Sequence, residues 1–253
     1  MTNLKPIAIQ LYTVREAMAQ DWIGTLEKIA EMGYLGVETA GFGYAPSVAA
    51  AVAKFAELGL TVVGAHSPLP LGEQQAQVLE TMAALGASRL ICAGTGRDQF
   101  GTLADVKERA QTFNEANAVA KANGLSFGLH NHWWEYTMVD GRRAYDILQE
   151  DLDDDIFFEI DTYWVQSAGF DAATEVAKLN ERAPLLHIKD GSTKQEDSML
   201  AVGSGVMDVP KIIAAGTNAE WLVVELDRCE TDMMTAVKES IQYLTREGLG
   251  RGR

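Results

Sequence analysis

The residues most able to carry chemistry in this chain are its histidines and a few acidic residues. There are only four histidines, and each lies in or directly after a short apolar segment. A lone histidine in such a segment is most often a core residue, but four histidines together with carboxylates favour a shared site that binds a metal or transfers protons. The residues are His66, His130, His132 and His187, with Asp161 and Glu225 at the ends of two later apolar segments.

Imidazole and carboxylate groups together suit Mn²⁺, Mg²⁺, Co²⁺, Fe²⁺ or Zn²⁺, and the lack of cysteine in the set argues against a structural zinc site. We therefore expect one divalent metal ion with mixed nitrogen and oxygen ligands. Such an ion, with a displaceable water among its ligands, suits Lewis-acid chemistry on a carbonyl or hydroxyl group, with a histidine or glutamate beside it to move a proton.

The elements that must position these residues are short apolar segments, which alternate with longer amphipathic ones. The short segments are almost continuously apolar, as is typical of strands covered on both faces. Amphipathic segments between them begin near an aspartate or proline, or stop at a glycine, as helices do. The predicted strands are residues 7–13, 36–40, 61–67, 89–93, 126–132, 157–162, 185–189 and 221–227, and the predicted helices are residues 22–32, 46–58, 72–85, 103–123, 142–150, 171–179, 209–215 and 232–246.

Eight strand–helix units in 253 residues predict a closed (β/α)8 TIM barrel of the α/β class, with residues 1–253 as a single domain. An open doubly wound sheet is the weaker alternative, because no glycine-rich phosphate loop follows the first strand. The tail, residues 248–253 (GLGRGR), is expected to be frayed.

Active sites of such barrels lie at the carboxyl ends of the strands. The last four predicted strands end at or within one residue of His132, Asp161, Lys189 and Asp227, and the second and third end near Glu38 and His66. Residues two apart in a strand share a face, so the polar members of each strand end should point together into the barrel mouth.

Composition narrows the classes of partner. Lys and Arg number 21 and Asp and Glu 36, so the net charge is −15, which disfavours binding to nucleic acid or to an anionic membrane surface. The two cysteines, Cys92 and Cys229, are too few for a disulfide scaffold and fit a cytoplasmic protein. The first residues lack the apolar core of a secretory signal. A homo-oligomer is compatible with the sequence, which does not indicate its size.

Seven short motifs follow one another along nearly the whole chain, and each is weak alone. They are residues 9–15 (IQLYTVR), 36–38 (GVE), 130–136 (HNHWWEY), 161–164 (DTYW), 187–190 (HIKD), 203–208 (GSGVMD) and 224–227 (VELD). As an ordered set they resemble the xylose isomerase-like TIM-barrel superfamily, the sugar phosphate isomerases/epimerases.

The resemblance implies one divalent metal held by Glu, Asp, His and Glu at four successive strand ends. Asp161, His187 and Glu225 match the last three ligands, whereas His130 stands in place of the first glutamate, so that His130, His132 or Glu135 is the first ligand. In relatives with a histidine two residues beyond the first ligand, that histidine is the proton-transfer base, which implies this role for His132. Glu135 resembles a family glutamate that contacts the substrate, and Glu225 is a further candidate base.

The resemblance implies a sugar substrate, and we expect an uncharged sugar or keto-sugar. Its adjacent carbonyl and hydroxyl groups would chelate the ion, which acidifies the carbon next to the carbonyl and stabilises an enediolate. A histidine or glutamate then moves the proton, and the outcome is isomerisation, epimerisation or loss of a β-oxygen.

Trp133 and Trp164 offer aromatic faces to a sugar ring, and Lys189 can stabilise an enolate, or is instead a charge partner of Asp190 or Glu159. Phosphate recognition has little support, since residues 203–205 (GSG) are the best candidate nest and lie among acidic residues. The predicted substrate-binding residues are therefore Glu38, His66, Trp133, Trp164 and Lys189.

Three alternatives to an isomerase or epimerase remain open. The first is a metal-dependent lyase or dehydratase acting on a 3-keto-sugar, keto-glycoside or inosose. The second is a sugar-binding barrel without activity. The third is an abasic-site endonuclease, which would need a basic groove and more histidines than the four present.

Overall fold

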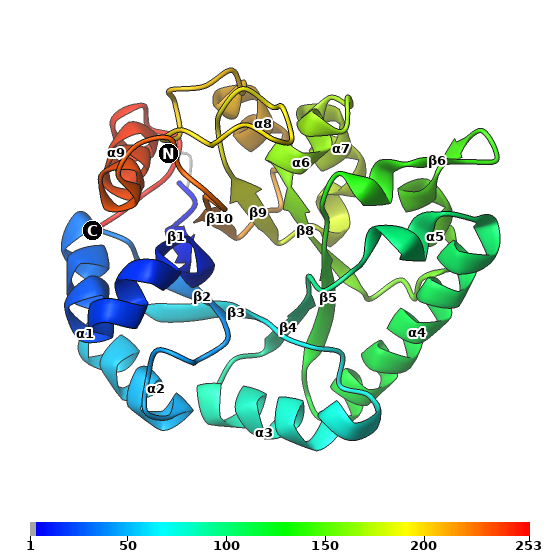
Figure 1. Cartoon of the computed structure of the whole chain (residues 1–253), viewed down its shortest axis with the longest axis horizontal. Helices are drawn as coiled ribbons and strands as arrows, with labels where there is room; N and C mark the ends of the chain where they lie inside the picture. The colour runs from blue at the N-terminus through cyan, green and yellow to red at the C-terminus, as the bar shows by residue number, and fades with distance from the viewer. Residues whose placement is uncertain (1–3) are drawn as a thin grey trace.

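The computed structural model describes residues 4–253, and within them eight parallel strands close into a barrel with the order β1-β10-β9-β8-β5-β4-β3-β2. Barrel strands that follow one another in the sequence are therefore neighbours in the barrel, and the last strand, β10, pairs with the first, β1 (Figure 1). The predicted single-domain TIM barrel is confirmed. The strands are β1 Ile7–Gln10, β2 Gly36–Ala40, β3 Thr61–His66, β4 Arg89–Cys92, β5 Ser126–His130, β8 Phe157–Asp161, β9 Leu185–Ile188 and β10 Trp221–Val224.

Helices form an outer layer around the strands (Figure 1). They are α1 Arg15–Met32, α2 Val48–Glu57, α3 Gln75–Leu85, α4 Leu103–Ala122, α5 Ala144–Asp151, α6 Thr162–Ser167, α7 Ala172–Leu179, α8 Val209–Ala215 and α9 Met233–Arg246. Among residues 4–253, no helix combines the length and the apolar character needed to cross a bilayer.

The barrel interior explains why the strands are apolar throughout. Every residue of β1 and of β8 is buried, because one face packs on the helices and the other fills the barrel. Ile91, Phe157 and Leu185 form an apolar layer inside the barrel. Gly128 on β5 belongs to this arrangement, since a Cβ atom there would lie 2.3 Å from the Phe157 ring.

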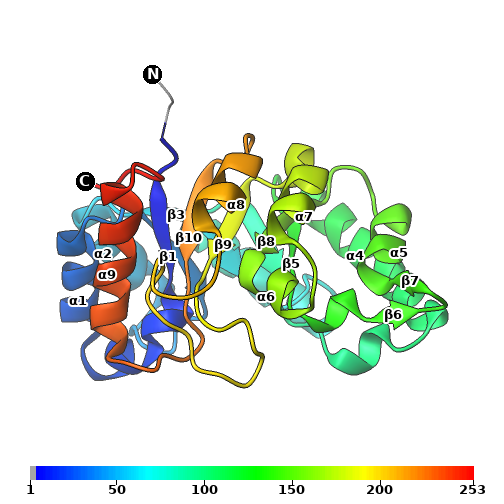
Figure 2. The same cartoon turned by 90° about the horizontal axis from the view of Figure 1, so that it is seen from above.

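Several predicted strands are too long at their carboxyl ends. Leu11–Val14 forms a 3-10 helix, and His132, Lys189 and Asp227 lie beyond the last paired residue of their strands. Strand pairing stops where the chain turns out over the barrel mouth, so these polar residues lie on loops that start at the strand ends. In Figure 2 the long connection between β9 and α8, drawn in yellow, extends beyond this same end of the barrel.

Some elements were not predicted from the sequence. Helix α6 begins directly after β8, because Asp161 accepts a hydrogen bond from the backbone N–H of Trp164 and so caps it. A small hairpin pairs β6 (Met138–Val139) with β7 (Arg142–Arg143). Helix α1 begins at Arg15 rather than near residue 22, with a break at Asp21, whose carboxylate accepts from Gly24 N–H.

The expectation of a frayed tail is wrong. Residues 249–253 run along the base of the barrel, where Arg251 N–H donates to Lys5 and Ile7 N–H donates to Arg251, at 2.9 and 3.1 Å. Arg253 N–H donates to Gly33 at 2.9 Å. A Cβ atom on Gly250 would lie 2.9 Å from the Ile7 side chain, so the glycines that suggested flexibility allow close packing instead.

Candidate active site

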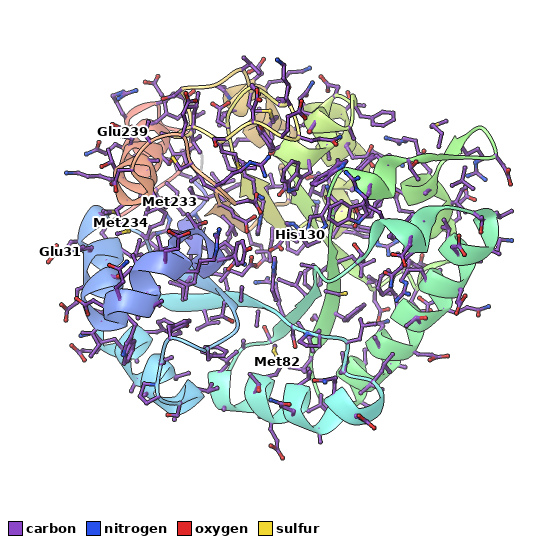
Figure 3. All side chains as sticks on the ribbon, viewed as in Figure 1. Glu31, Met82, His130, Met233, Met234 and Glu239 are labelled. Atoms are coloured by element: carbon purple, nitrogen blue, oxygen red, sulfur yellow. The ribbon has the colours of Figure 1, made fainter. Side chains whose placement is uncertain are left out.

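A buried polar cluster lies inside the barrel at the carboxyl ends of the strands. The strand register builds it, because His130 on β5 pairs with Glu159 on β8, and Asp161 pairs with His187 on β9. Figure 3 shows His130 near the middle of the ring of strands. The cluster consists of Gln10, Glu38, His66, His130, Glu159, Asp161, His187, Lys189 and Glu225.

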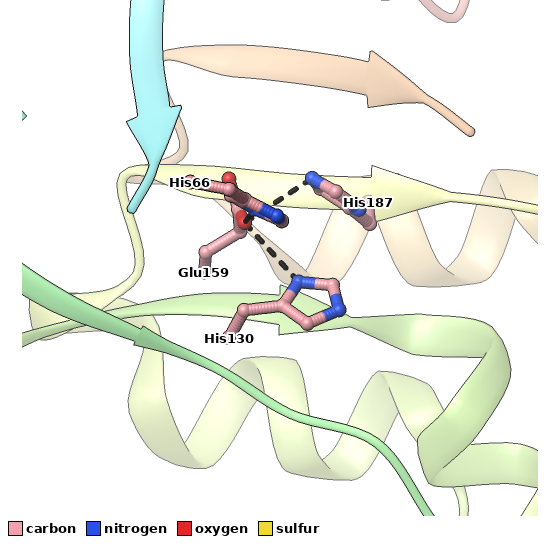
Figure 4. Close-up of side chains that lie close together, drawn as sticks. All are labelled: His66, His130, Glu159 and His187. Carbon is pink, nitrogen blue, oxygen red and sulfur yellow. Dashed lines mark hydrogen bonds and ion pairs between the residues drawn. The ribbon is translucent and has the colours of Figure 1, made fainter. Parts of the chain in front are cut away.

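The deeper layer of the cluster centres on Glu159. Its Oε2 lies 2.6 Å from His66 Nε2, 3.1 Å from His130 Nδ1 and 3.2 Å from His187 Nε2 (Figure 4). One carboxylate oxygen of Glu159 therefore contacts three imidazoles at once.

Glu38 occupies the same layer from β2. Its Oε2 accepts from the Gln10 amide at 2.6 Å and lies 2.8 Å from His187 Nε2 and 3.1 Å from His66 Nε2. The Glu38 side chain is fully buried, and its contact with substrate stays a prediction. Its carboxylate fixes the imidazoles.

Burial and charge set the protonation of this layer. Burial alone lowers the pKa of His66, but the carboxylates of Glu38 and Glu159 raise it to about 10. Burial alone raises the pKa of Glu38, but the charges of His66 and His187 hold it well below its usual range. Burial, together with the neighbouring histidines, holds the pKa of His130 well below its usual value, so His130 is a neutral imidazole with a lone pair.

The upper layer holds Asp161, Glu225 and Lys189. The Lys189 ammonium lies 2.8 Å from Asp161 Oδ2, 2.6 Å from Glu225 Oε2 and 2.7 Å from Asp227 Oδ2. Glu225 Oε2 also lies 2.9 Å from His187 Nδ1. Lys189 therefore pairs with three carboxylates at the mouth, and neither Asp190 nor Glu159 is its partner.

Two overlapping groups of side chains could hold a divalent ion. One is His130, Asp161, His187 and Glu225, and the other is His66, His130, Glu159 and His187; within each group the candidate ligand atoms lie within 4.8 Å of one another. In the first group His130 turns Nε2 toward Asp161 Oδ2 at 3.7 Å. This gap is too long for a hydrogen bond and matches the roughly 3–4 Å between two ligands of one ion. The residues of the first group therefore fit the expected cofactor.

His132 and Glu135 lie beside these groups and belong to neither. The His132 ring stacks on Trp134 with centroids 4.0 Å apart, and its backbone N–H donates to Glu135 Oε2 at 2.8 Å. The Glu135 carboxylate is buried and also accepts from the Thr95 hydroxyl. Glu135 thus holds the loop that carries His132, a role that sequence reasoning did not anticipate.

The aromatic residues form one wall of the site. The rings of Trp133 and Trp164 lie 4.6 Å apart, and the Lys189 ammonium is 5.2 Å from the centre of the Trp164 ring. Trp164 is buried and Trp133 half-buried, so only Trp133 offers a partly accessible face. On the opposite side, His66 borders a cavity of about 290 Å³ that Phe42 and Val78 also line.

Asp190 is a buried residue whose structural role the sequence motifs do not indicate. Its carboxylate accepts from the backbone N–H groups of Gly191, Gly203 and Met207 at 2.8, 2.9 and 3.0 Å. The candidate nest at residues 203–205 thus already gives its first N–H to a carboxylate of the protein. No signal within the HIKD motif indicates a partner thirteen residues away.

Comparison with known proteins identifies a family and supports the same fold. A family model described as the xylose isomerase-like TIM barrel matches residues 26–247. A solved sugar phosphate isomerase/epimerase from Parabacteroides distasonis is 23% identical and has a TM-score of 0.84, with 99% of this chain and 96% of that chain covered. No curated protein matches the sequence.

Two further structures share the fold at lower identity. An L-ribulose 3-epimerase is 17% identical with a TM-score of 0.68, over 97% of this chain and 95% of that chain. A probable 3-DHS dehydratase from Bacillus anthracis is 11% identical with a TM-score of 0.75, over 95% and 98%. Identities this low carry the fold alone, whereas the family model spans most of the chain. The chain belongs to the xylose isomerase-like TIM barrel family.

Proposed function

We propose that this chain is a divalent-metal-dependent isomerase or epimerase of a small sugar or keto-sugar. The observation that carries the proposal is the convergence of His130, Asp161, His187 and Glu225 at the barrel mouth, with His132 beside them and outside the set. Two imidazoles and two carboxylates suit an ion such as Mn²⁺, Mg²⁺, Co²⁺, Fe²⁺ or Zn²⁺.

When bound, a divalent ion supplies a Lewis acid for the carbonyl and neighbouring hydroxyl of the sugar. His132 accepts the proton from the hydroxyl-bearing carbon next to the carbonyl, because its ring reaches the mouth and is not needed as a ligand. Glu135 positions His132 through the backbone of its loop. Trp133 faces the apolar side of the sugar ring.

The fate of the proton distinguishes the products. Return by His132 to the neighbouring carbon gives an isomer. Delivery of a proton to the opposite face of the same carbon gives an epimer and requires a second group that already holds a proton. Burial raises the pKa of Glu225, but the charges of Lys189 and His187 lower it, so Glu225 is an ionised carboxylate and the Lys189 ammonium beside it is the candidate donor. The buried Glu38 holds the imidazoles, whereas the partly exposed His66 borders the neighbouring cavity and stays a candidate contact for the substrate.

A metal-dependent lyase or dehydratase of a keto-sugar, keto-glycoside or inosose is the second candidate. Loss of a β-oxygen begins with the same proton abstraction and needs one further proton donor at the leaving oxygen. The Lys189 ammonium at the mouth is such a donor, and the fold is shared with a probable 3-DHS dehydratase.

We propose an uncharged substrate in a cytoplasmic protein that binds neither nucleic acid nor membranes. The net charge of −15 repels anions, and Asp190 already occupies an amide of the only glycine-rich loop singled out for phosphate. Both cysteines are free, in keeping with a reducing compartment.

The test is a screen of keto-sugars, inososes and keto-glycosides with the chelated protein and with Mn²⁺, Co²⁺ or Zn²⁺ restored. An isomer or epimer that requires metal, detected by NMR, supports the first candidate, and an unsaturated product that absorbs in the ultraviolet supports the second. The variant Asp161→Asn is the inactive control. Sugar binding with no turnover of any compound would leave a binding barrel and contradict both candidates.

A further inference from the structure

The Lys189 ammonium is a buried cation placed among three carboxylates. Lys189 is 1% exposed, and its Nζ lies within 2.6–2.8 Å of Asp161, Glu225 and Asp227. The first two carboxylates belong to the group that fits a divalent ion, whereas the third does not. Two of the three carboxylate partners are therefore candidate metal ligands, and Asp227 is not.

An ammonium group and a divalent ion would compete here for the same two carboxylates, those of Asp161 and Glu225. A metal–oxygen bond is about 2.0–2.2 Å long, so an ion bound to Asp161 Oδ2 and Glu225 Oε2 would crowd an ammonium already within hydrogen-bond distance of both. Two cations that share two buried oxygens also repel one another strongly. Occupation by the ion therefore requires Lys189 to leave these carboxylates.

Asp227 is placed to keep the ammonium when it leaves. Its side chain is 29% exposed, at the rim of the site. Its backbone is held independently, since its carbonyl accepts from Arg15 at 2.9 Å and its N–H lies 3.4 Å from the Met199 sulfur. A lysine stem is flexible enough to turn from the inner carboxylates toward this outer one.

The geometry points to Lys189 as an internal competitor of the divalent ion, with Asp227 as the carboxylate to which its ammonium withdraws when the ion binds. This inference rests on the proposed metal site. It explains why a lysine can be buried beside metal ligands, and it makes Lys189 and Asp227 positioning residues that set metal affinity.

The experiment is calorimetric titration of the chelated protein with Mn²⁺ alone. Lys189→Met removes the competitor at similar size, and we expect its Kd for Mn²⁺ to fall about 10–100-fold. Asp227→Asn removes the withdrawal site and should raise Kd by about 10-fold or more. In the double variant Lys189→Met/Asp227→Asn, the loss of Asp227 should have little further effect, because no ammonium remains to be relocated.

If Lys189 and Asp227 affected the ion only through their separate charges, the changes in Mn²⁺-binding free energy caused by the two substitutions would add in the double variant. The matched control is Glu230→Gln, an exposed carboxylate on the same loop, which should leave Kd unchanged. Equal effects of Asp227→Asn with and without Lys189 would overturn the withdrawal role, and an unchanged Kd in Lys189→Met would overturn the competition.

If Lys189→Met does not fold, Asp227→Asn carries the test, and an unchanged Kd in this variant overturns the inference. If the folded wild-type chain and Lys189→Met both bind no Mn²⁺, Co²⁺ or Zn²⁺, the proposed metal site itself has failed, and with it the inference.

Discussion

Replacement of His132 by glutamine tests the assignment of the base. The structure gives reason to expect a folded variant, because the His132 side chain is 20% exposed and its main packing contact is the stacked Trp134 ring. Such a ring pair contributes about 0.5–1.5 kcal/mol, a small part of the roughly 5–15 kcal/mol that stabilises a typical domain.

The expected loss of activity is much larger than the loss of stability. A general base contributes about 10²–10⁴-fold to the rate, which corresponds to about 3–5 kcal/mol of barrier. Because His132 lies outside both candidate metal groups, we expect kcat to fall by that factor while the metal content per chain stays unchanged.

The assay pairs kcat on the substrate found in the screen with elemental analysis of the dialysed protein. His132→Phe is a second variant, which keeps an aromatic ring against Trp134 but has no nitrogen to accept a proton, and it should lose activity to the same degree. Loss of metal together with activity would make His132 a ligand and pass the base role to Glu225 or Glu135. An unchanged kcat would refute the mechanism.

Three other predictions follow from the geometry. Gly128→Ala places a methyl group 2.3 Å from the Phe157 ring and should lower the free energy of unfolding by roughly 1–3 kcal/mol in denaturant titrations. The control is Gly43→Ala, whose methyl group meets nothing within 4 Å and should leave that free energy unchanged. Equal effects of the two substitutions would contradict close packing at Gly128. The pKa of His66 is raised to about 10, so its contribution to stability is complete below its unfolded pKa of about 6.5 and is lost as pH rises toward 10. The unfolding free energy of the chelated protein should therefore fall over that pH interval. If it fell equally with pH in a His66→Gln variant, the contribution assigned to His66 would be contradicted. For an uncharged substrate, kcat/KM should change by less than about twofold between 20 and 200 mM salt, and a steep loss would instead indicate a charged sugar.

The barrel was predictable because its signals are local. Each strand shows as a short apolar run, and Gly33, Gly86 and Gly124 mark the ends of helices in the sequence as they do in the structure. Strand ends were harder to predict, because pairing with the neighbouring strand decides where a strand stops. The segment at residues 162–167 is rich in residues that favour strands, yet it forms α6 because Asp161 caps it.

The candidate site was predictable only in part. The sequence indicates that His130, Asp161, His187 and Glu225 meet, and they do lie together, although their role as ligands stays a prediction. Partners across strands depend on register and on the loops beyond the strands, which no single segment reveals. The central place of Glu159 and the pairing of Lys189 with Asp227 therefore emerged only from the three-dimensional arrangement.

Proton exchange with solvent tests the central claim most directly. The substrate is incubated in D₂O with the chelated protein, with the protein and restored metal, and with metal-loaded Asp161→Asn. We predict deuterium at the carbon beside the carbonyl, detected by NMR, only with wild-type protein and metal. Turnover without any deuterium under the metal-loaded condition, or equal exchange after chelation, would contradict a metal-dependent enediolate route.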